Sequence, residues 1–308
     1  MRKLRTTAVL VLAMMIVCAA CTKDPDNGDD SVVVPKGAIN GLFTVNENGD
    51  KVYFSQGNLQ YNKATNEWSF MEHQYDMLEV NAEDVGENCV SLNMISLFGW
   101  GTSGYDHGAV CYQPWSTDYQ ASRYYAYGKY NENLCDESGQ ADWGYNAIVN
   151  GGNVNNAWRT LTGVEWHYVF LTRSTASGIH FAKAKVNGVN GVLLLPDDWD
   201  KGYFTLNNTD TRSASFDSNV ITLSQWTALE QHGVVFFPAA GYRCYSIGKI
   251  SVCGVGELGH YWSSSYNNAI YTDYTSAFLL KFEDSGLNPL YNYNRNHGRS
   301  VRLVCDAK

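Results

Sequence analysis

The chain has 308 residues, of which 44% are hydrophobic, 14% aromatic and only 17% charged. This apolar content is enough to bury a sizeable core, so the composition excludes an intrinsically disordered chain, a collagen and a coiled coil. The 28 glycines and 21 tyrosines indicate a globular body with many turns. A net charge of −9 makes nucleic acid a poor partner.

The N-terminus has the features of an export signal. Three basic residues near the start precede an apolar run from Ala8 to Val17, and small residues then precede Cys21. This order resembles the lipobox of bacterial lipoproteins, which implies that residues 1–20 are a signal peptide and that Cys21 carries the lipid. A single transmembrane anchor is the alternative, but the run is too short to span a bilayer comfortably.

An acidic polar stretch follows Cys21, and we expect residues 21–36 to be a flexible tether. Removing residues 1–20 takes three of the 22 Lys and Arg residues and none of the 31 Asp and Glu residues, which leaves a net charge of −12. The stretch resembles the acidic export signal of Bacteroidetes lipoproteins. That resemblance implies a lipid-anchored protein of the outer membrane that faces the cell exterior.

Six cysteines remain beyond Cys21, at positions 89, 111, 135, 244, 253 and 305. An even number in an oxidising compartment suggests disulfides, and several pairings are open. Cys244 and Cys253 flank a segment in which Gly248 could turn a hairpin, so they are the first candidate pair, followed by Cys111 with Cys135. No cysteine or histidine spacing is typical of zinc.

From residue 37 onwards the sequence favours short strands separated by turn residues. We expect a hairpin formed by Gly41–Val45 and Lys51–Ser55. A second hairpin is predicted around Asn187 and Gly188, because Asn-Gly accepts positive φ at both central positions of a tight turn.

Two helices are expected to interrupt the strands. Thr162 and Glu165 have the spacing of a capping box, and a second helical pattern starts near Ser224 and ends at Gly233. The stretch from Asn81 to Gly152 shows little periodicity, so we expect large ordered loops there.

The last third returns to strand patterns, and an α+β domain with few helices follows. The expected strands are Gly233–Pro238, Tyr261–Ser265, Ala277–Phe282 and Ser300–Val304.

Five motifs occur in one order along the chain: Trp158–Trp166, Leu193–Trp199, Phe237–Arg243, Gly259–Ser265 and Ser300–Val304. They resemble the Fibrobacter succinogenes major paralogous domain and its Bacteroidetes lipoprotein relatives, and more widely the C-type lectin-like fold of the formylglycine-generating enzymes. The resemblance implies one domain over residues 37–308. It would have small twisted antiparallel sheets, two helices, and long loops at one end where ligands are contacted.

Most of the aromatic residues in these motifs are expected to be structural. Trp166, Trp226, Trp262 and Phe278 lie in helix or strand patterns, so we expect them in the core. Arg302 alternates with apolar neighbours, and we expect it to fix the terminal strand in place.

Two C-terminal segments, Tyr266–Thr275 and Leu287–Gly298, are rich in Asn and Tyr and contain no Lys, Glu, Gln, Met or Trp. Codons that end in a pyrimidine cannot encode those five residues, whereas Tyr, His, Ile, Leu and Asp are reached from an Asn codon by changing adenines. The pattern resembles the variable region of proteins that retroelements diversify, in which such positions form the binding surface. An ordinary polar loop is the alternative.

Tyrosine gives large contact area at low entropic cost and asparagine gives adaptable hydrogen bonds, so these segments are the predicted ligand contacts. The predicted contact residues are Tyr266, Asn267, Asn268, Tyr271, Asp273, Tyr274, Tyr291, Asn292, Tyr293, Asn294, Asn296 and His297.

The sequence contains little evidence of catalytic or metal-binding residues. Oxidases of this fold use a paired-cysteine copper site near the C-terminus, whereas Cys305 has no second cysteine close by in the sequence. The seven histidines have no metal-binding spacing. Gln113-Pro114 is the nearest match to the calcium motif of animal lectins and lacks its carboxylate, and the acidic run 197–200 also fits a capped turn. We therefore expect no enzyme activity and no cofactor, and leave calcium unassigned.

The sequence thus predicts a surface-anchored, non-enzymatic binding or adhesion lipoprotein. Its Asn- and Tyr-rich loops would contact a protein or glycan ligand at the cell surface. A structural subunit or tip component of a surface filament is one alternative, and an enzyme with the oxidase fold is another.

Overall fold

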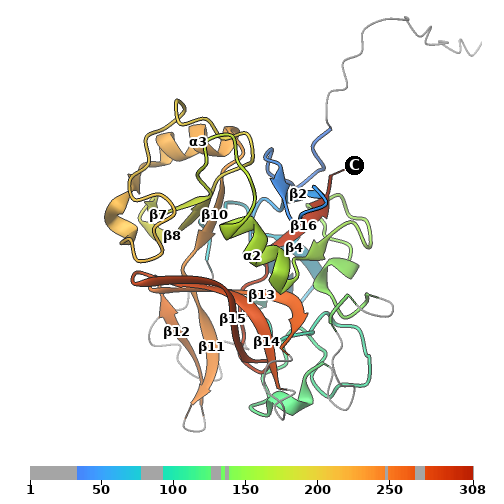
Figure 1. The fold of residues 1–308 in the computed structure, drawn as a ribbon. Coiled ribbons are helices and arrows are strands. Elements are labelled where there is room, and N and C mark those ends of the chain that lie inside the picture. The colour runs from blue at the N-terminus through green and yellow to red at the C-terminus, as the bar shows by residue number, and fades with distance from the viewer. Residues whose placement is uncertain are drawn as a thin grey trace, which may run out of the picture. The chain divides into compact units, whose positions relative to one another are not determined.

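The computed structural model describes residues 33–77, 93–125, 133–135, 139–246, 249–267 and 275–307. The chain divides into two units, Met1–Val33 and Val34–Lys308, and the second contains every helix and strand of the described residues (Figure 1). These elements are two α-helices and small sheets that are mainly antiparallel, with some parallel pairing. The unit has an α+β fold, as the sequence predicted.

The first sheet joins the two ends of this unit in the order β1-β2-β16-β6. Its strands are β1 (Phe43–Thr44), β2 (Lys51–Phe54), β16 (Leu303–Asp306) and β6 (Arg159–Thr160). The hairpin expected from residues 41–55 is confirmed by the antiparallel pairing of β1 with β2. The terminal strand begins at Leu303 rather than at Ser300, because Gly298 and Ser300 form bridges with Arg243 and Tyr261 instead.

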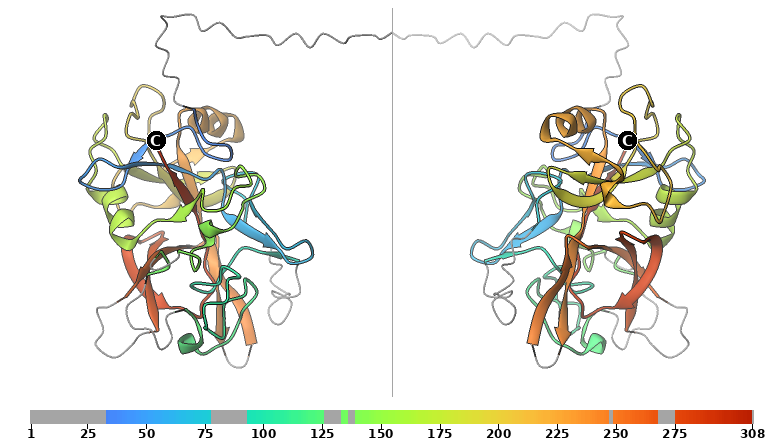
Figure 2. Two further views of the ribbon diagram at one scale, coloured as in Figure 1. Left: turned by 90° about the vertical axis from the view of Figure 1, so that its right-hand side faces the viewer. Right: turned by 90° about the vertical axis from the view of Figure 1, so that its left-hand side faces the viewer.

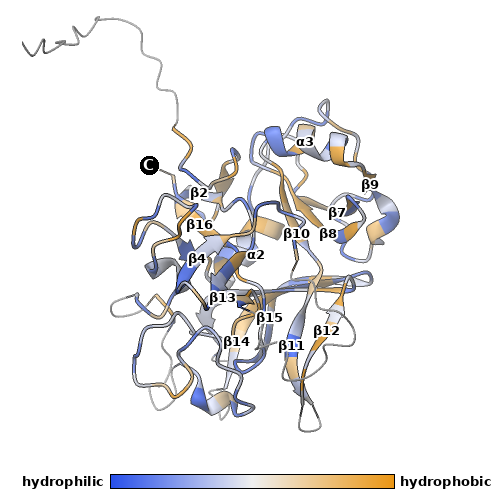
Figure 3. Cartoon of the chain, turned by 180° about the vertical axis from the view of Figure 1, so that it is seen from behind, coloured by the Kyte–Doolittle hydropathy of each residue, from blue (hydrophilic) through white to orange (hydrophobic). Residues whose placement is uncertain are grey.

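The second sheet, in the order β10-β8-β7-β9, contains the predicted Asn-Gly hairpin. Its strands are β7 (Phe181–Val186), β8 (Val189–Leu194), β9 (Val220–Ile221) and β10 (Val235–Pro238). Asn187 and Gly188 have φ values of 47° and 82°, which fit the expected tight turn. Every residue of β10 is buried, and Figure 3 shows the strand as strongly hydrophobic.

The third sheet is the largest and has the order β12-β11-β13-β14-β15. Its strands are β11 (Ala240–Ser246), β12 (Lys249–Val255), β13 (Leu258–Tyr266), β14 (Ser276–Glu283) and β15 (Gly286–Asn294). The β11–β12 hairpin joins β13 through one parallel pair, Gly241 with Gly259, and β13, β14 and β15 pair antiparallel. Residues 287–294 were expected to form a loop, and that expectation is wrong because they form the edge strand β15.

A smaller sheet and several loops complete the unit. The sheet has the order β4-β3-β5, with β3 (Leu59–Asn62), β4 (Glu67–Phe70) and β5 (Met94–Ile95). The described residues between 96 and 158 contain two short 3-10 helices, η1 (Ala121–Arg123) and η2 (Trp143–Tyr145). Irregular ordered loops were expected in this region. Figure 2 shows the teal segments, around residues 96–125, near the β11–β12 hairpin.

Both helices begin with a complete capping box. In α2 (Gly163–Leu171) the Thr162 hydroxyl accepts from the backbone N–H of Glu165, and the Glu165 carboxylate accepts from the N–H of Thr162. In α3 (Leu223–Gln231) Thr222 and Gln225 exchange the same two bonds. Both predicted helices are confirmed, and Gly233, with a φ of 78°, follows the end of α3 as expected.

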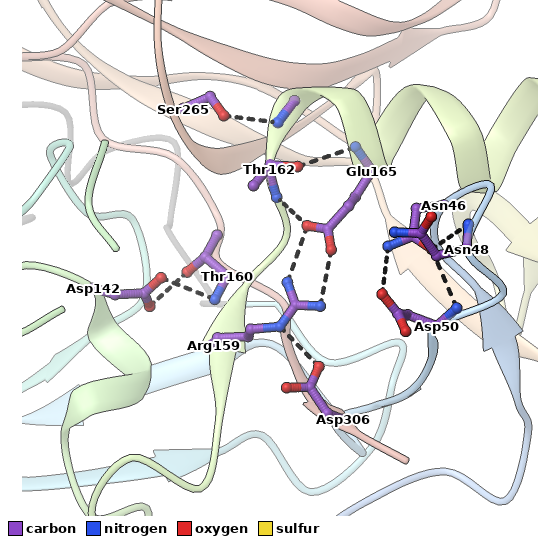
Figure 4. Close-up of polar contacts among 11 residues, drawn as sticks. Asn46, Asn48, Asp50, Asp142, Arg159, Thr160, Thr162, Glu165, Ser265 and Asp306 are labelled. Atoms are coloured by element: carbon purple, nitrogen blue, oxygen red, sulfur yellow. Dashed lines mark hydrogen bonds and ion pairs between the residues drawn. The ribbon is translucent and has the colours of Figure 1, made fainter. Parts of the chain in front are cut away.

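The start of α2 is tied to three other elements (Figure 4). Arg159 in β6 donates two hydrogen bonds of 2.9 Å to the Glu165 carboxylate, and its Nε donates to Asp306 of β16, also at 2.9 Å. The N–H of Gly163 donates to Ser265 Oγ of β13 at 3.1 Å. The first sheet, the third sheet and α2 therefore meet at this point.

Three hydrophobic clusters form the core, and they contain the expected tryptophans. Trp166 lies in the first cluster, Trp262 in the second and Trp226 in the third, each almost fully buried. Phe278 is only half-buried, so its placement in the core was wrong. Arg302 is confirmed as a structural residue, and its guanidinium donates to Asn58 Oδ1, Ser55 O and Phe236 O over distances of 2.8 to 3.1 Å.

No disulfide links the five cysteines in the described part of the chain. Cys244 and Cys253 lie on adjacent strands of the β11–β12 hairpin, with their Sγ atoms 3.1 Å apart. Cys111 is buried, whereas Cys135 is exposed. Cys21 and Cys89 lie outside the described residues. None of the helices described is long and apolar enough to cross a membrane.

Candidate ligand-binding surface

The predicted contact residues are distributed unevenly over the structure. Asn268, Tyr271, Asp273 and Tyr274 lie outside the described residues. Tyr266 is half-buried and packs against the second hydrophobic cluster. The remaining predicted contacts lie near the start of the 267–275 connection, in β15, or in the turn after β15.

Two predicted contacts are structural. Asn267 is 2% exposed and its Nδ2 donates to Ser276 Oγ at 3.2 Å. Asn296 is 9% exposed and its Nδ2 donates to Tyr119 O at 2.9 Å. Both amides therefore bind neighbouring segments rather than facing solvent, which disfavours them as ligand contacts.

The pleat of β15 separates four other predicted contacts onto opposite faces. Tyr291 pairs with Leu279 and Tyr293 pairs with Ala277, whereas Asn292 pairs with Phe278. Because side chains alternate along a strand, Tyr291 and Tyr293 share one face, and Asn292 and Asn294 share the other. The tyrosines therefore lie on a different face of β15 from the asparagines.

The turn after β15 brings His297 back to the tyrosine face. The His297 ring lies edge-on to Tyr293, with ring centroids 4.8 Å apart, and nearly parallel to Tyr242 of β11 at 5.8 Å. Tyr291 and Tyr293 stack at 6.5 Å. Tyr293 is 38% exposed, and the other three rings are half-buried. We call these four rings, together with Arg299 beneath them, the Arg299 cluster.

Arg299 is fully buried beneath these rings. Its guanidinium carbon lies 4.8 Å from the centroid of Tyr293, 4.9 Å from that of Trp262 and 5.4 Å from that of Tyr242. No carboxylate among the described residues forms an ion pair with it. The ring faces therefore provide the main electrostatic compensation for its charge. Burial lowers the pKa of Arg299 to about 9.

Several polar atoms around Arg299 have no hydrogen-bond partner among the described residues. Arg299 Nη1 donates to His260 Nδ1, while Nε and Nη2 of Arg299 and Nε2 of His260 are buried without a partner there. Because Nδ1 accepts this bond, the proton of His260 is on Nε2. A cation with unused N–H groups is unusual in a protein interior, since each unsatisfied donor costs free energy.

The histidines add no charge to the cluster near neutral pH. Burial and the positive charge of Arg299 lower the pKa of His260 to about 2 and that of His297 to about 4. Lys281 of β14 lies on the same face, with Nζ 5.1 Å from the Tyr291 centroid and 3.2 Å from Glu283 Oε1. The arrangement is aromatic and locally positive, although the chain as a whole is acidic.

Sequence reasoning found Tyr291, Tyr293 and His297 but missed Tyr242 and Arg299. These residues come from separate strands and from the turn before β16, so no local motif joins them. One signal was present, because Tyr291-Asn292-Tyr293-Asn294 alternates with a period of two, which is typical of a strand with two different faces.

The residues that the sequence suggested for metal or redox chemistry have other roles or an unsuitable environment in the structure. Asp197 accepts hydrogen bonds from Thr44 Oγ1 and Arg173 Nη1, each at 2.6 Å. In the described part of the chain, no group of three or more His, Cys, Asp or Glu side chains is placed to hold a metal ion. Burial raises the pKa of the Cys305 thiol to about 11, which leaves little of the reactive thiolate at neutral pH.

Comparison with known proteins adds one match. A family model described as a domain of unknown function, DUF8237, matches residues 200–304. Neither a curated protein nor a solved structure matches the chain. The matched range includes the third sheet and every residue of the Arg299 cluster, so the chain is similar to this family of unknown function over the part that contains the candidate site.

Proposed function

We propose that the protein is a surface-anchored, non-enzymatic lipoprotein that binds a protein or glycan ligand through the Arg299 cluster. The observation that carries the proposal is the set of four half-buried or partly exposed rings above a buried guanidinium that lacks a carboxylate partner among the described residues. Such rings give contact area at low entropic cost. The cation beneath them favours a ligand group with negative charge.

The proposal also assigns the unit to the C-type lectin-like fold. Its support is the combination of small twisted sheets, two helices and long loops, together with the pairing of the first hairpin with the terminal strand. In Figure 1 the described loops of residues 96–125 lie near the ends of β11 and β14. Ligand contacts are expected at that end of the fold.

The binding test compares two exposed tyrosines. Tyr293 in the Arg299 cluster is 38% exposed, and Tyr203, which lies outside the cluster, is 50% exposed. The purified full chain would be applied to arrays of glycans and extracellular matrix proteins. Tyr293→Ala is expected to weaken binding to the captured ligand by about tenfold or more, as for an aromatic interface residue.

Tyr203→Ala is the control and is expected to bind that same ligand like the parent chain. Near-ultraviolet circular dichroism would establish that both variants are folded. Equal binding by Tyr293→Ala and the parent chain would contradict the assignment of the ligand to the Arg299 cluster.

We further propose that the C-terminal segments are diversified between cells. Sequencing the 3′ end of the gene from many cells tests this, with the DNA downstream searched for a near-copy. Differences are expected at the codons of Tyr291, Tyr293 and His297. None is expected at Asn267 or Asn296, whose amides bind neighbouring segments. An invariant 3′ end without a nearby copy would remove this mechanism and leave a fixed binding protein.

The lipid anchor has its own test. Cells labelled with a radioactive or clickable fatty acid should incorporate label into the parent chain and not into Cys21→Ser. Protease added to intact cells should degrade the parent chain if it faces the exterior. Equal labelling of both chains would contradict lipidation at Cys21.

A further inference from the structure

A cavity lies on a different part of the molecule from the Arg299 cluster and shares no residue with it. It has a volume of about 370 Å³ and is bordered by the β3–β4 hairpin and by the loops around residues 103–114 and 145–147. This volume is at the lower end of the range for small-molecule sites in proteins, which suits a small ligand. Neither the proposed function nor the family match assigns a role to it.

Aromatic rings form much of the cavity wall. Tyr61 and Trp68 pack against each other with centroids 4.8 Å apart and are almost fully buried, so they make a rigid floor. Tyr105 and Tyr145 approach at 6.1 Å with an angle of 57° between their rings. Tyr105 is 39% exposed, which leaves part of its ring available to a ligand.

Amide side chains supply the polar part of the wall. Asn66 Oδ1 accepts from the Tyr61 hydroxyl at 2.8 Å, and Asn146 Nδ2 donates to Ser103 O at 2.9 Å. These bonds fix both amides, yet Asn66 Nδ2 and Asn146 Oδ1 have no partner among the described residues. The side-chain amide of Gln113 has none there either. The wall therefore offers both donors and acceptors.

None of the described residues that border the cavity is charged. Amides and tyrosine hydroxyls can bind a ligand that both donates and accepts hydrogen bonds, but they cannot neutralise a phosphate, a carboxylate or an ammonium group. A ligand that packs against the aromatic rings must also have an apolar face. A neutral sugar ring has both properties, because its hydroxyls lie around the rim and its C–H groups form the faces.

We infer that this cavity is a binding site for a neutral saccharide, in which Tyr105 contacts a face of the sugar ring and Gln113 binds its hydroxyls. The site is independent of the Arg299 cluster. The chain would then bind two chemically different ligands, one at an aromatic and positive surface and one at an aromatic and uncharged cavity.

Saturation-transfer difference NMR with the purified full chain tests this inference. The probes are methyl α-glucoside, methyl β-galactoside, N-acetylglucosamine and cellobiose, with glucuronic acid as the charged counterpart. At least one neutral probe is expected to receive saturation through its ring C–H protons. Glucuronic acid is expected to bind more weakly, because none of the described residues at the cavity offers a cation to its carboxylate.

Variants locate the bound sugar. Tyr105→Ala and Gln113→Ala are each expected to weaken binding of the neutral probe by about tenfold. Tyr105→Phe, which keeps the ring, should bind nearly as well as the parent chain, and Tyr293→Ala should be unchanged. Circular dichroism would check that each variant is folded.

Three outcomes would overturn the inference: no neutral probe is saturated, Tyr105→Ala binds like the parent chain, or Tyr293→Ala loses the sugar while Tyr105→Ala keeps it. The third outcome would move sugar binding to the Arg299 cluster and would support the proposed function. If Tyr293→Ala loses binding on the arrays and neither the parent chain nor any variant binds a sugar, only the saccharide inference is overturned and the proposed function stands.

Discussion

His297 links the chemistry of the Arg299 cluster to the stability of the fold. Its pKa is lowered from 6.5 to about 4 by burial and by the charges of Arg299 and Arg243. The unfolded chain therefore takes up a proton between about pH 6.5 and 4 that the folded chain does not. His297 thus contributes stability above pH 6.5, and that contribution is lost as the pH falls towards 4.

Urea denaturation at pH 7 and at pH 4.5 checks this prediction. The free energy of unfolding of the parent chain should decrease more between these two pH values than that of His297→Gln. The difference should be about 2 kcal/mol, because solvent screens the partly exposed ring and reduces the effect. His180 has the opposite effect, because its hydrogen bond with Asp210 raises its pKa. His180 is present in both chains, so it cancels in the comparison. An equal decrease in both chains would contradict the assignment.

The two capping boxes allow a comparison at the level of the helix. Thr162 caps α2 where Glu165 also binds Arg159, which in turn binds Asp306, whereas Thr222 caps the exposed start of α3. Thr162→Ala should lower the free energy of unfolding by about 1 to 2 kcal/mol, and Thr222→Ala by about 1 kcal/mol or less. Thermal and urea denaturation of the two variants measure the difference. A larger effect at Thr222 would show that the connections of Thr162 add nothing.

The β11–β12 hairpin carries a second prediction at this level. The Sγ atoms of Cys244 and Cys253 are 3.1 Å apart, so we propose that they form a disulfide when the chain is exposed to an oxidant such as oxidised glutathione. Alkylation without reduction, followed by peptide mass spectrometry, should recover the two cysteines as one linked pair. Cys111 should be alkylated once the chain is denatured. Recovery of Cys244 and Cys253 as alkylated thiols after oxidation would contradict the proposal.

The elements that the sequence predicted correctly depend on neighbouring residues. Asn187-Gly188 specifies its turn and Thr162 with Glu165 specifies a helix start, because each motif makes its own hydrogen bonds. The Arg299 cluster could not be found in this way, since a ring of β11 and a guanidinium from the turn before β16 meet only through the pairing of distant strands. Residues 287–294 were predicted as a loop because their Asn- and Tyr-rich composition resembles a variable region, although β15 tolerates Asn and Pro289 at the edge of its sheet.

At the scale of the whole molecule, β16 holds the core together. It lies between β2 and β6, and its residues contribute to two hydrophobic clusters, Val304 to the first and Leu303 to the second. A chain that ends at Arg302 should fail to fold, because both clusters lose buried apolar residues and β2 loses one of its two partners. Near-ultraviolet circular dichroism and limited proteolysis measure this. Asp306→Ala, which removes only the exposed partner of Arg159, is the control and should fold normally.

The pairing of β2 with β16 also determines the order of events during synthesis. Tyr53 and Cys305 are partners across these strands, although 252 positions separate them in the chain. Closing so long a loop is slow, and β2 leaves the ribosome long before its partner β16 has been made. The first sheet therefore cannot close until β16 has been made. A nascent chain that remains open for this long is in a state that an export channel for unfolded polypeptides can accept.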